Sequence, residues 1–230
     1  CTQRRGRGVT PPRRRGGRRR RMTGWRLMAP APRSRTPRPG PTRPAAGEGG
    51  AWSAARVLAS MIDDPAEVTA GQLDAWAGDF DNWDICDQCC LNLFWKTSRA
   101  YDRAAAWAAA GGEYVKRAGF VLMASLAVHD KKQGDEDFRG FLVIIEREAG
   151  DGRTYVRKAV NWALRQIGKR NAALRREAVR VAAGLGTAES KSARWVGADA
   201  LRELESEAVR RRVEARGRGG IIGDIPERRS

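Results

Sequence analysis

The stretch that decides the fold is YVRKAVNWALRQIGKR, residues 155–170. Its apolar side chains recur every three or four residues, which is the spacing that places them along one face of an α-helix. This core stripe comprises Val156, Ala159, Val160, Ala163 and Ile167. Lys158, Trp162, Arg165 and Lys169 fall together beside it, so the helix presents an aromatic ring among cations on a second face.

Parts of this stretch recur elsewhere in the chain. The motif YVRKA at 155–159 resembles YVKRA at 114–118, and ALRQ at 163–166 resembles ALRE at 200–203, so the spacings are close to 40 residues. Helix pairs that repeat at this period are typical of HEAT-like solenoids, in which each pair stacks on its neighbours. We therefore expect an all-α, HEAT-like α-α superhelix whose second helices line a concave surface.

Glycines and capping residues separate nine amphipathic segments in residues 51–230. The predicted helices are 52–62, 69–79, 84–95, 98–110, 113–129, 136–149, 153–170, 172–184 and 190–213. The second helices of the pairs are 84–95, 113–129, 153–170 and 190–213, which are rich in Trp, Lys and Arg. No set of segments alternates with the period of two that strands require.

The charge of the chain is very unevenly distributed. Residues 1–50 hold 15 arginines, one acid, eight prolines and nine glycines, a charge of +14, whereas residues 51–230 hold 29 basic and 26 acidic residues, a charge of +3. We expect 1–50 to be a disordered basic segment able to bind any polyanion, and it is open whether it is a genuine tail or a mis-translated start. We expect the helical domain to span 51–213 and a flexible tail to span 214–230.

A second cluster of interest is FDNWDICDQCC, residues 80–90. Trp83 and Asp87 are four residues apart and share a face of the predicted helix. A carboxylate beside an indole can stabilise positive charge and orient a water molecule, although a structural role for Asp87 is equally open. Asp84 is expected to be a first-turn or capping acid. Cys86, Cys89 and Cys90 are expected to be small buried residues, because structural zinc needs four ligands.

Arg117, in the first copy of the repeated motif, lies off the core stripe of its helix. Its guanidinium is suited to grip a phosphate through two oxygens. The alternative for Arg117 is a solvated cation. The alternative for the face with Lys158, Arg165 and Lys169 is a solvated basic surface on which Trp162 is half-buried at a helix contact.

Taken together, residues 80–87, 114–118 and 155–162 resemble the DNA alkylation repair family, which contains HEAT-like-repeat glycosylases acting on alkylated purines. The resemblance covers about 51–212 and implies catalytic roles for Asp87, Trp83 and Trp162. It implies DNA contacts by Arg117, and we add Lys158, Arg165 and Lys169 as phosphate-binding residues. Family members have about one further helical pair before 51–62, so we expect an exposed apolar end there.

The function predicted from these features is hydrolysis of the N-glycosidic bond of positively charged N3- or N7-alkylated purines in duplex DNA by a monomeric, monofunctional glycosylase. We expect no metal, no small-molecule cofactor and no membrane contact. The four cysteines, three of them clustered, do not form the framework of a disulfide-rich protein, and the Arg-rich start lacks the apolar stretch of a signal peptide. Both features favour a cytoplasmic location near the bacterial nucleoid. Two alternatives remain: a non-catalytic HEAT protein that binds distorted DNA, and a scaffold that binds a protein partner and loses DNA affinity without residues 1–50. The preferred adducts, and whether bases are flipped, stay open.

Overall fold

A computed structural model describes residues 49–219, with side chains from 54 to 216. All of them belong to one of the two units into which the chain divides, residues 36–230. The described residues form helices only: α1 (Gly49–Ile62), α2 (Ala70–Gly78), α3 (Trp83–Asn92), a 3₁₀ turn η1 (Phe94–Lys96), α4 (Ala100–Ala108), α5 (Glu113–His129), α6 (Asp135–Glu148), α7 (Thr154–Gly168), α8 (Ala172–Gly186), α9 (Lys191–Leu204) and α10 (Glu207–Gly219). The all-α prediction is confirmed, and the predicted basic segment lies outside the described residues except at its last two positions.

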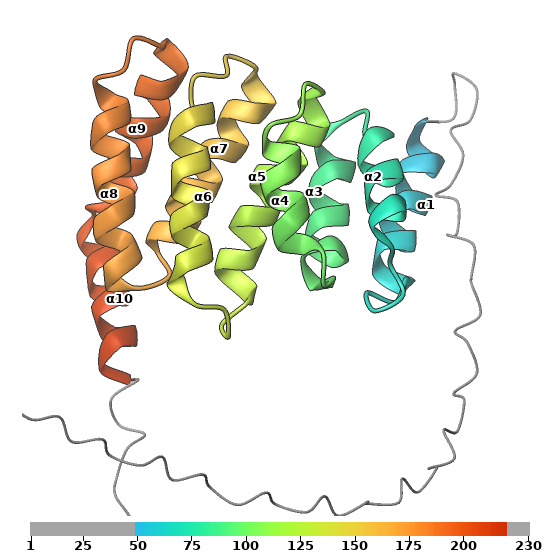
Figure 1. The fold of residues 1–230 in the computed structure, drawn as a ribbon, viewed down its shortest axis with the longest axis horizontal. Coiled ribbons are helices and arrows are strands. Elements are labelled where there is room, and N and C mark those ends of the chain that lie inside the picture. Colours follow the sequence, from blue (N-terminus) through green and yellow to red (C-terminus); the bar gives the residue numbers. More distant parts are fainter. Residues whose placement is uncertain (1–48, 220–230) are drawn as a thin grey trace, which may run out of the picture. The chain divides into compact units, whose positions relative to one another are not determined.

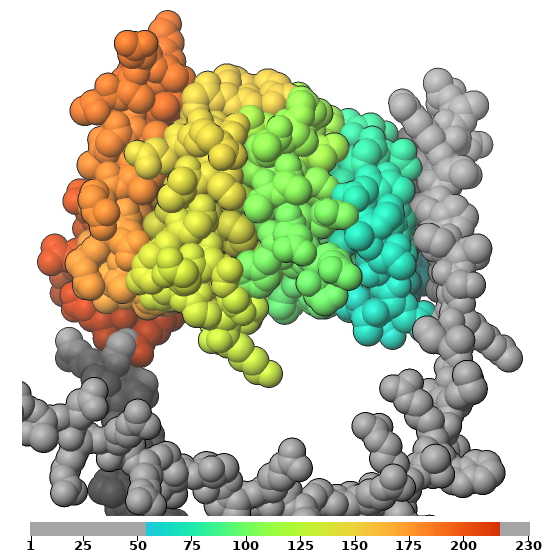
Figure 2. Space-filling model, in the orientation of Figure 1, coloured from blue at the N-terminus to red at the C-terminus, as the bar shows by residue number. Residues whose placement is uncertain are grey.

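The helices form two layers (Figure 1). The first layer contains α1, α3, α5, α7 and α9, each packed on the next. The second contains α2, α4, α6, α8 and α10, and α4, α6 and α8 pack in sequence along it. Figure 2 shows side chains filling the gaps between the ribbons on the face in view. The arrangement is that of a helical-repeat solenoid.

Contacts within the first layer join residues at nearly constant spacing. The thiols of Cys86 and Cys90 donate to the carbonyl oxygens of Tyr114 and Ala118, in both cases 28 positions further along the chain. Constant spacing requires that α3 and α5 run in the same direction. Side chains at the start of α3 therefore lie near the start of α5, which places Asp87 opposite Arg117.

The core lies between the layers, and α5 is its centre. Twelve consecutive residues of α5, Lys116–Ala127, are buried. Phe94, Phe120 and Phe138 are among the largest side chains that are fully enclosed. A helix buried on nearly every side needs neighbours in both layers, and α5 packs on α3 and α7 in its own layer and on α4 across the core.

Two predicted boundaries were wrong for local reasons. The helix expected over 84–95 ends at Asn92, because Leu93 leaves the helical conformation (φ −124°, ψ −58°) and a 3₁₀ turn follows. The helix expected over 190–213 is two helices, α9 and α10. They separate where the Ser206 hydroxyl donates to Glu203 O and accepts from Val209 N. α10 continues to Gly219, into the segment expected to be a flexible tail.

The expected apolar end is present at α1. Leu58, Met61 and Ile62 are 56%, 61% and 75% exposed. No described helix has both the length and the apolar character needed to cross a membrane.

Candidate functional site

Asp87 and Arg117 form a two-pronged ion pair between α3 and α5. The Arg117 Nε donates to Asp87 Oδ1 at 2.8 Å, and Nη2 donates to Oδ2 at 2.7 Å. The side chains are 12% and 8% exposed respectively. Asp87 is therefore not an open carboxylate in this state, and Arg117 is not a solvated cation, which corrects the solvated-surface alternative for that residue.

Arg117 also connects this pair to α7 and to Trp83. Its Nη1 donates to the carbonyl oxygen of Tyr155 at 2.7 Å. Its Cζ lies 6.0 Å from the centroid of the Trp83 ring, which is 46% exposed. One guanidinium of α5 thus joins α3 and α7 and places an exposed indole at the rim of the Asp87 carboxylate.

The start of α3 explains why Trp83 stands at that rim. Asn82 caps the helix, with its side-chain oxygen accepting from Ile85 N at 3.0 Å. Trp83 is therefore the first helical residue, and Ile85 and Cys86 turn into the core. Asp84 is the first-turn acid that the sequence suggested.

Burial raises the pKa of the Asp87 carboxyl above its ordinary value, and the hydrogen bonds and charge of Arg117 oppose that rise. The pKa of Arg117 is raised by the same contact, although its own burial acts in the opposite direction. Arg117 consequently favours the ionised form of a carboxylate whose burial favours the neutral form.

The cationic face of α7 is largely neutralised by α9. Glu203 accepts from Lys169 Nζ at 2.6 Å and also pairs with Arg165. Lys158 is exposed, and no ion pair reaches it from the described residues. The interpretation of Arg165 and Lys169 as unengaged phosphate ligands does not describe this state.

Trp162 is half-buried and packs against the core. It follows Tyr155, whose carbonyl Arg117 contacts, by seven residues, or about 10 Å along the axis of α7. The structure therefore brings Trp83, Asp87 and Arg117 into direct contact, and it places Trp162 further along the same layer.

The three clustered cysteines are buried free thiols, as expected. Burial raises the pKa of Cys89 to about 12, so this thiol stays protonated at neutral pH. Cys86 and Cys90 hold α3 against α5 through their bonds to backbone carbonyls.

A comparison with protein-family models adds the decisive observation. Residues 50–204 match the model described as DNA alkylation repair enzyme, and this range contains every side chain of the site described above. The chain belongs to the DNA alkylation repair enzyme family. Searches of curated proteins and of solved structures returned no match.

Membership of the DNA alkylation repair family makes DNA the substrate and the repair of alkylated bases the activity. The match ends at the last residue of α9. α10 therefore lies beyond the part of the chain that the family model describes.

In a DNA repair enzyme, an aromatic and cationic surface in the first layer is a candidate for DNA contact. Part of this surface was not predicted from the sequence. Trp195 on α9 is 39% exposed, and the Cζ of Arg157 lies 4.7 Å from its ring centroid. Tyr114 and Tyr155 pair at 5.8 Å between the starts of α5 and α7. The sequence did offer one indication of this surface, because Trp195 lies at the edge of the apolar stripe of its helix.

Proposed function

We propose that this protein is a monofunctional glycosylase that hydrolyses the N-glycosidic bond of cationic N3- or N7-alkylated purines in duplex DNA. The observation that carries the proposal is the Asp87–Arg117 pair at the rim formed by Trp83. A carboxylate kept ionised by a guanidinium, beside an exposed indole, suits a reaction that develops positive charge on a sugar.

The reaction needs little help with its leaving group, because alkylation already makes the purine positive. As the bond between C1′ and the base nitrogen breaks, its electron pair neutralises the base, and positive charge builds on the deoxyribose. A water oxygen bonds to C1′ and its proton passes to Asp87 or to solvent. An ionised Asp87 stabilises the charged sugar and orients the water.

Arg117 links DNA binding to this chemistry. In the described state it occupies both oxygens of Asp87. A DNA phosphate competes for the same guanidinium, which binds phosphate and carboxylate with the same fork geometry. When a phosphate beside the lesion draws Arg117 away, the Asp87 carboxylate loses its counter-ion, and the cationic base or the charged sugar takes that place.

The surrounding aromatic and cationic residues hold the DNA. Trp83 and Trp162 offer ring faces to the sugar and to the charged base, each worth about 0.5–2 kcal/mol by cation–π attraction. Lys158 is available for a phosphate, whereas Arg165 and Lys169 become available once Glu203 releases them.

No amine in contact with Asp87 in the described part of the chain suggests lyase chemistry. Lys116 is buried, but its Nζ is held by Glu148 at 2.7 Å and by Asp151 at 3.1 Å. An amine paired with two carboxylates is a poor nucleophile, so hydrolysis by water is favoured over a Schiff-base route.

Selectivity on this mechanism comes from the lability of the charged lesion, so the enzyme tolerates bulky adducts and leaves neutral lesions intact. A duplex that contains uracil should not be cleaved, whereas one that contains N7-methylguanine should be. Equal rates on the two duplexes would defeat the proposal.

The decisive experiment replaces the carboxylate and keeps its shape. Asp87→Asn should lower the rate of 7-methylguanine release by about 10²–10⁴-fold, because it removes the group that stabilises the charged sugar. Asp84→Asn is the matched control, since it makes the same charge change one turn away on an exposed residue, and it should retain activity.

The second candidate function is non-catalytic binding to distorted DNA, and the engagement of Asp87 with Arg117 is the observation that favours it. The same variants discriminate the two. If wild-type protein binds alkylated duplex but releases no base, and Asp87→Asn changes neither property, then the binding function is correct.

A further inference from the structure

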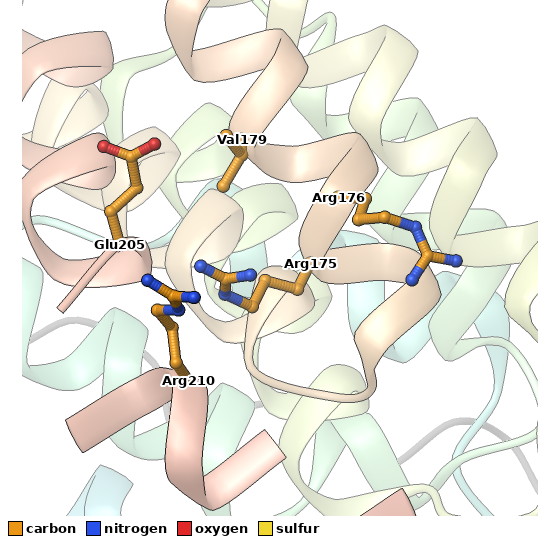
Figure 3. A pocket seen from close by; sticks show the side chains of 5 residues that line it. All are labelled: Arg175, Arg176, Val179, Glu205 and Arg210. Carbon is orange, nitrogen blue, oxygen red and sulfur yellow. The ribbon is translucent and has the colours of Figure 1, made fainter. Parts of the chain in front are cut away.

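A basic hollow lies between α8 and α10, away from the Asp87 site. It has a volume of about 570 Å³ and is lined by Arg175, Arg176, Val179, Glu205 and Arg210. Arg175 and Arg210 direct their guanidinium groups toward each other, whereas the guanidinium of Arg176 points away from them (Figure 3). Three cations and one acid therefore surround one open space.

The arginines of this hollow lack the carboxylate partners that Arg139, on the neighbouring α6, possesses. Arg175 is fixed by one bond, from its Nε to the carbonyl oxygen of Leu204 at 2.8 Å. Among the described residues no carboxylate lies within the 4.0 Å of an ion pair from Arg175, Arg176 or Arg210, although Glu205 is at the rim. By contrast, Arg139 on α6 has carboxylate partners in Glu136 and Glu177.

Positive charge continues around α10 to the surface of α7. Arg216 Nη1 donates to the carbonyl oxygen of Lys169 at 3.0 Å. Lys131 lies in the same neighbourhood, since its pKa is lowered first by burial and then by the charges of Arg216, Arg170 and Arg212. A cationic path therefore leads from the end of α7 to both sides of α10.

We propose that the hollow between α8 and α10 binds a phosphate group through Arg175 and Arg210, and that this phosphate belongs to the backbone of DNA that extends past the lesion. Two guanidinium groups that converge on one space can share a tetrahedral oxyanion, each with paired N–H donors. The anion supplies the missing counter-charge. The proposal rests on the proposed function only in taking duplex DNA as the ligand, and it assigns α10, which lies beyond the family match, a role in holding it.

The test measures binding of the full chain to an undamaged duplex at several salt concentrations, so it does not depend on glycosylase chemistry. Arg175→Gln with Arg210→Gln should weaken binding and make the slope of log K against log salt smaller by about 0.9, the value for one lost phosphate contact. Arg180→Gln with Arg194→Gln is the matched control, because it removes the same charge from two exposed arginines of α8 and α9 that do not line the hollow, and it should leave the slope closer to that of wild type.

A second measurement identifies the source of the phosphate. Inorganic phosphate should raise the melting temperature of wild-type protein more than that of the Arg175/Arg210 variant, at equal ionic strength. A phosphate effect with an unchanged DNA slope would support the site and assign it to free phosphate. If the variant and its control agree in both measurements, the hollow binds no phosphate and the proposal is overturned.

Discussion

At the scale of single residues, the proposed mechanism depends on which partner Arg117 holds. Its guanidinium satisfies both oxygens of Asp87 and a backbone carbonyl of α7, and it lies over Trp83. A bidentate contact of this kind is strong, but a phosphate presents the same geometry with at least equal charge. On the proposed mechanism the ion pair is a resting arrangement that DNA exchanges, and until then the charge of Arg117 favours the ionised form of Asp87.

The pH dependence of base release should reveal this protection. Burial raises the pKa of Asp87 and Arg117 opposes the rise, so activity falls as the pH drops through the pKa of Asp87. Arg117→Gln removes the opposing charge, and the acidic midpoint should move to higher pH. Single-turnover rates at subsaturating enzyme, which report the free enzyme with its ion pair in place, measured from acidic to neutral pH, test this. Lys158→Gln should weaken DNA binding without moving the midpoint, and identical midpoints for the two variants would contradict the role given to Arg117.

A second residue-scale prediction concerns Asp151, which ties the α6–α7 connection to α5. It accepts from Arg153 Nη2 at 2.6 Å and from Lys116 Nζ at 3.1 Å, and bonds from Arg153 hold its pKa well below the ordinary range. An acid with a lowered pKa stabilises the fold above its unfolded pKa, near 3.9, and the contribution is lost as the pH falls below that value. Asp151→Asn should therefore lower the free energy of unfolding by about 1–3 kcal/mol at pH 7.

Urea unfolding at pH 7 and at lower pH checks this sign. The difference between wild type and Asp151→Asn should shrink as the pH decreases. Glu214→Gln, an exposed acid on α10, should stay within about 0.5 kcal/mol of wild type at every pH. A difference that grows toward acid would show that Asp151 is not held ionised by its neighbours.

The side chains of the candidate site could be predicted from the sequence, but the contacts between them could not. Trp83, Asp87 and Arg117 could be singled out because each lies off the apolar stripe of its helix, and that placement depends only on local periodicity. Their pairing could not be deduced, because it depends on the register between α3 and α5. For the same reason Glu203 was missed as the counter-ion of Arg165 and Lys169, since it lies 38 and 34 positions away on another helix.

At the scale of elements, close packing between the layers depends on small residues at helix contacts. An added Cβ at Gly119 of α5 would lie 2.5 Å from the backbone nitrogen of Ala108 and 2.9 Å from the carbonyl oxygen of Ala104. Those atoms belong to α4, a helix whose backbone cannot yield locally.

The limits of some helices were predictable from the sequence. The helices at 113–129 and 172–184 were predictable to within two residues because glycine pairs and an Asn cap mark their limits, whereas no comparable residue marks the division at Ser206.

Replacement of Gly119 by alanine tests this contact. Gly119→Ala should lower the free energy of unfolding by about 1–3 kcal/mol, because the two helices must separate to admit the methyl group. Gly140→Ala on α6 is the matched control, since an added Cβ there meets no atom within 4 Å. It should raise stability by about 0.5–1 kcal/mol through the better helix propensity of alanine. Equal effects of the two changes would mean that α4 and α5 are not packed this closely.

The α7–α9 contact makes an element-scale prediction about affinity. Glu203 pairs with both Arg165 and Lys169, so Glu203→Gln should add one net positive charge to this face and raise affinity for duplex DNA several-fold, with a salt slope steeper by about 0.9. Asp199→Asn removes the same charge from the same helix, but its partner is Arg202. If both variants raise affinity equally, the gain reflects general charge and not the release of the α7 face.

At the scale of the whole array, stability should be graded along the helices. In a repeat array each unit is stabilised only by its neighbours, so central helices are held from both sides and a terminal helix from one. α5 is central and carries a run of twelve buried residues, whereas α1 leaves Leu58, Met61 and Ile62 open to solvent. This grading places Arg117, on α5, in the part of the array that opens least often, and Asp87, on α3, in a helix of intermediate stability.

Hydrogen exchange of backbone amides should report the gradient directly. Amides of α5 and α7 should exchange only through the largest openings, and those of α1 and α10 should exchange fastest, with α3 between them. The comparison must be made at low and high protein concentration, because an apolar face such as that of α1 is protected if a second copy covers it. Rapid exchange in α1 at both concentrations fits an open terminal repeat, and slow exchange that appears only at high concentration identifies association through that face. If α1 exchanges as slowly as α5 even at low concentration, then the stability of the array does not depend on nearest neighbours alone, and the argument that Arg117 is anchored on the most rigid helix of the array no longer holds.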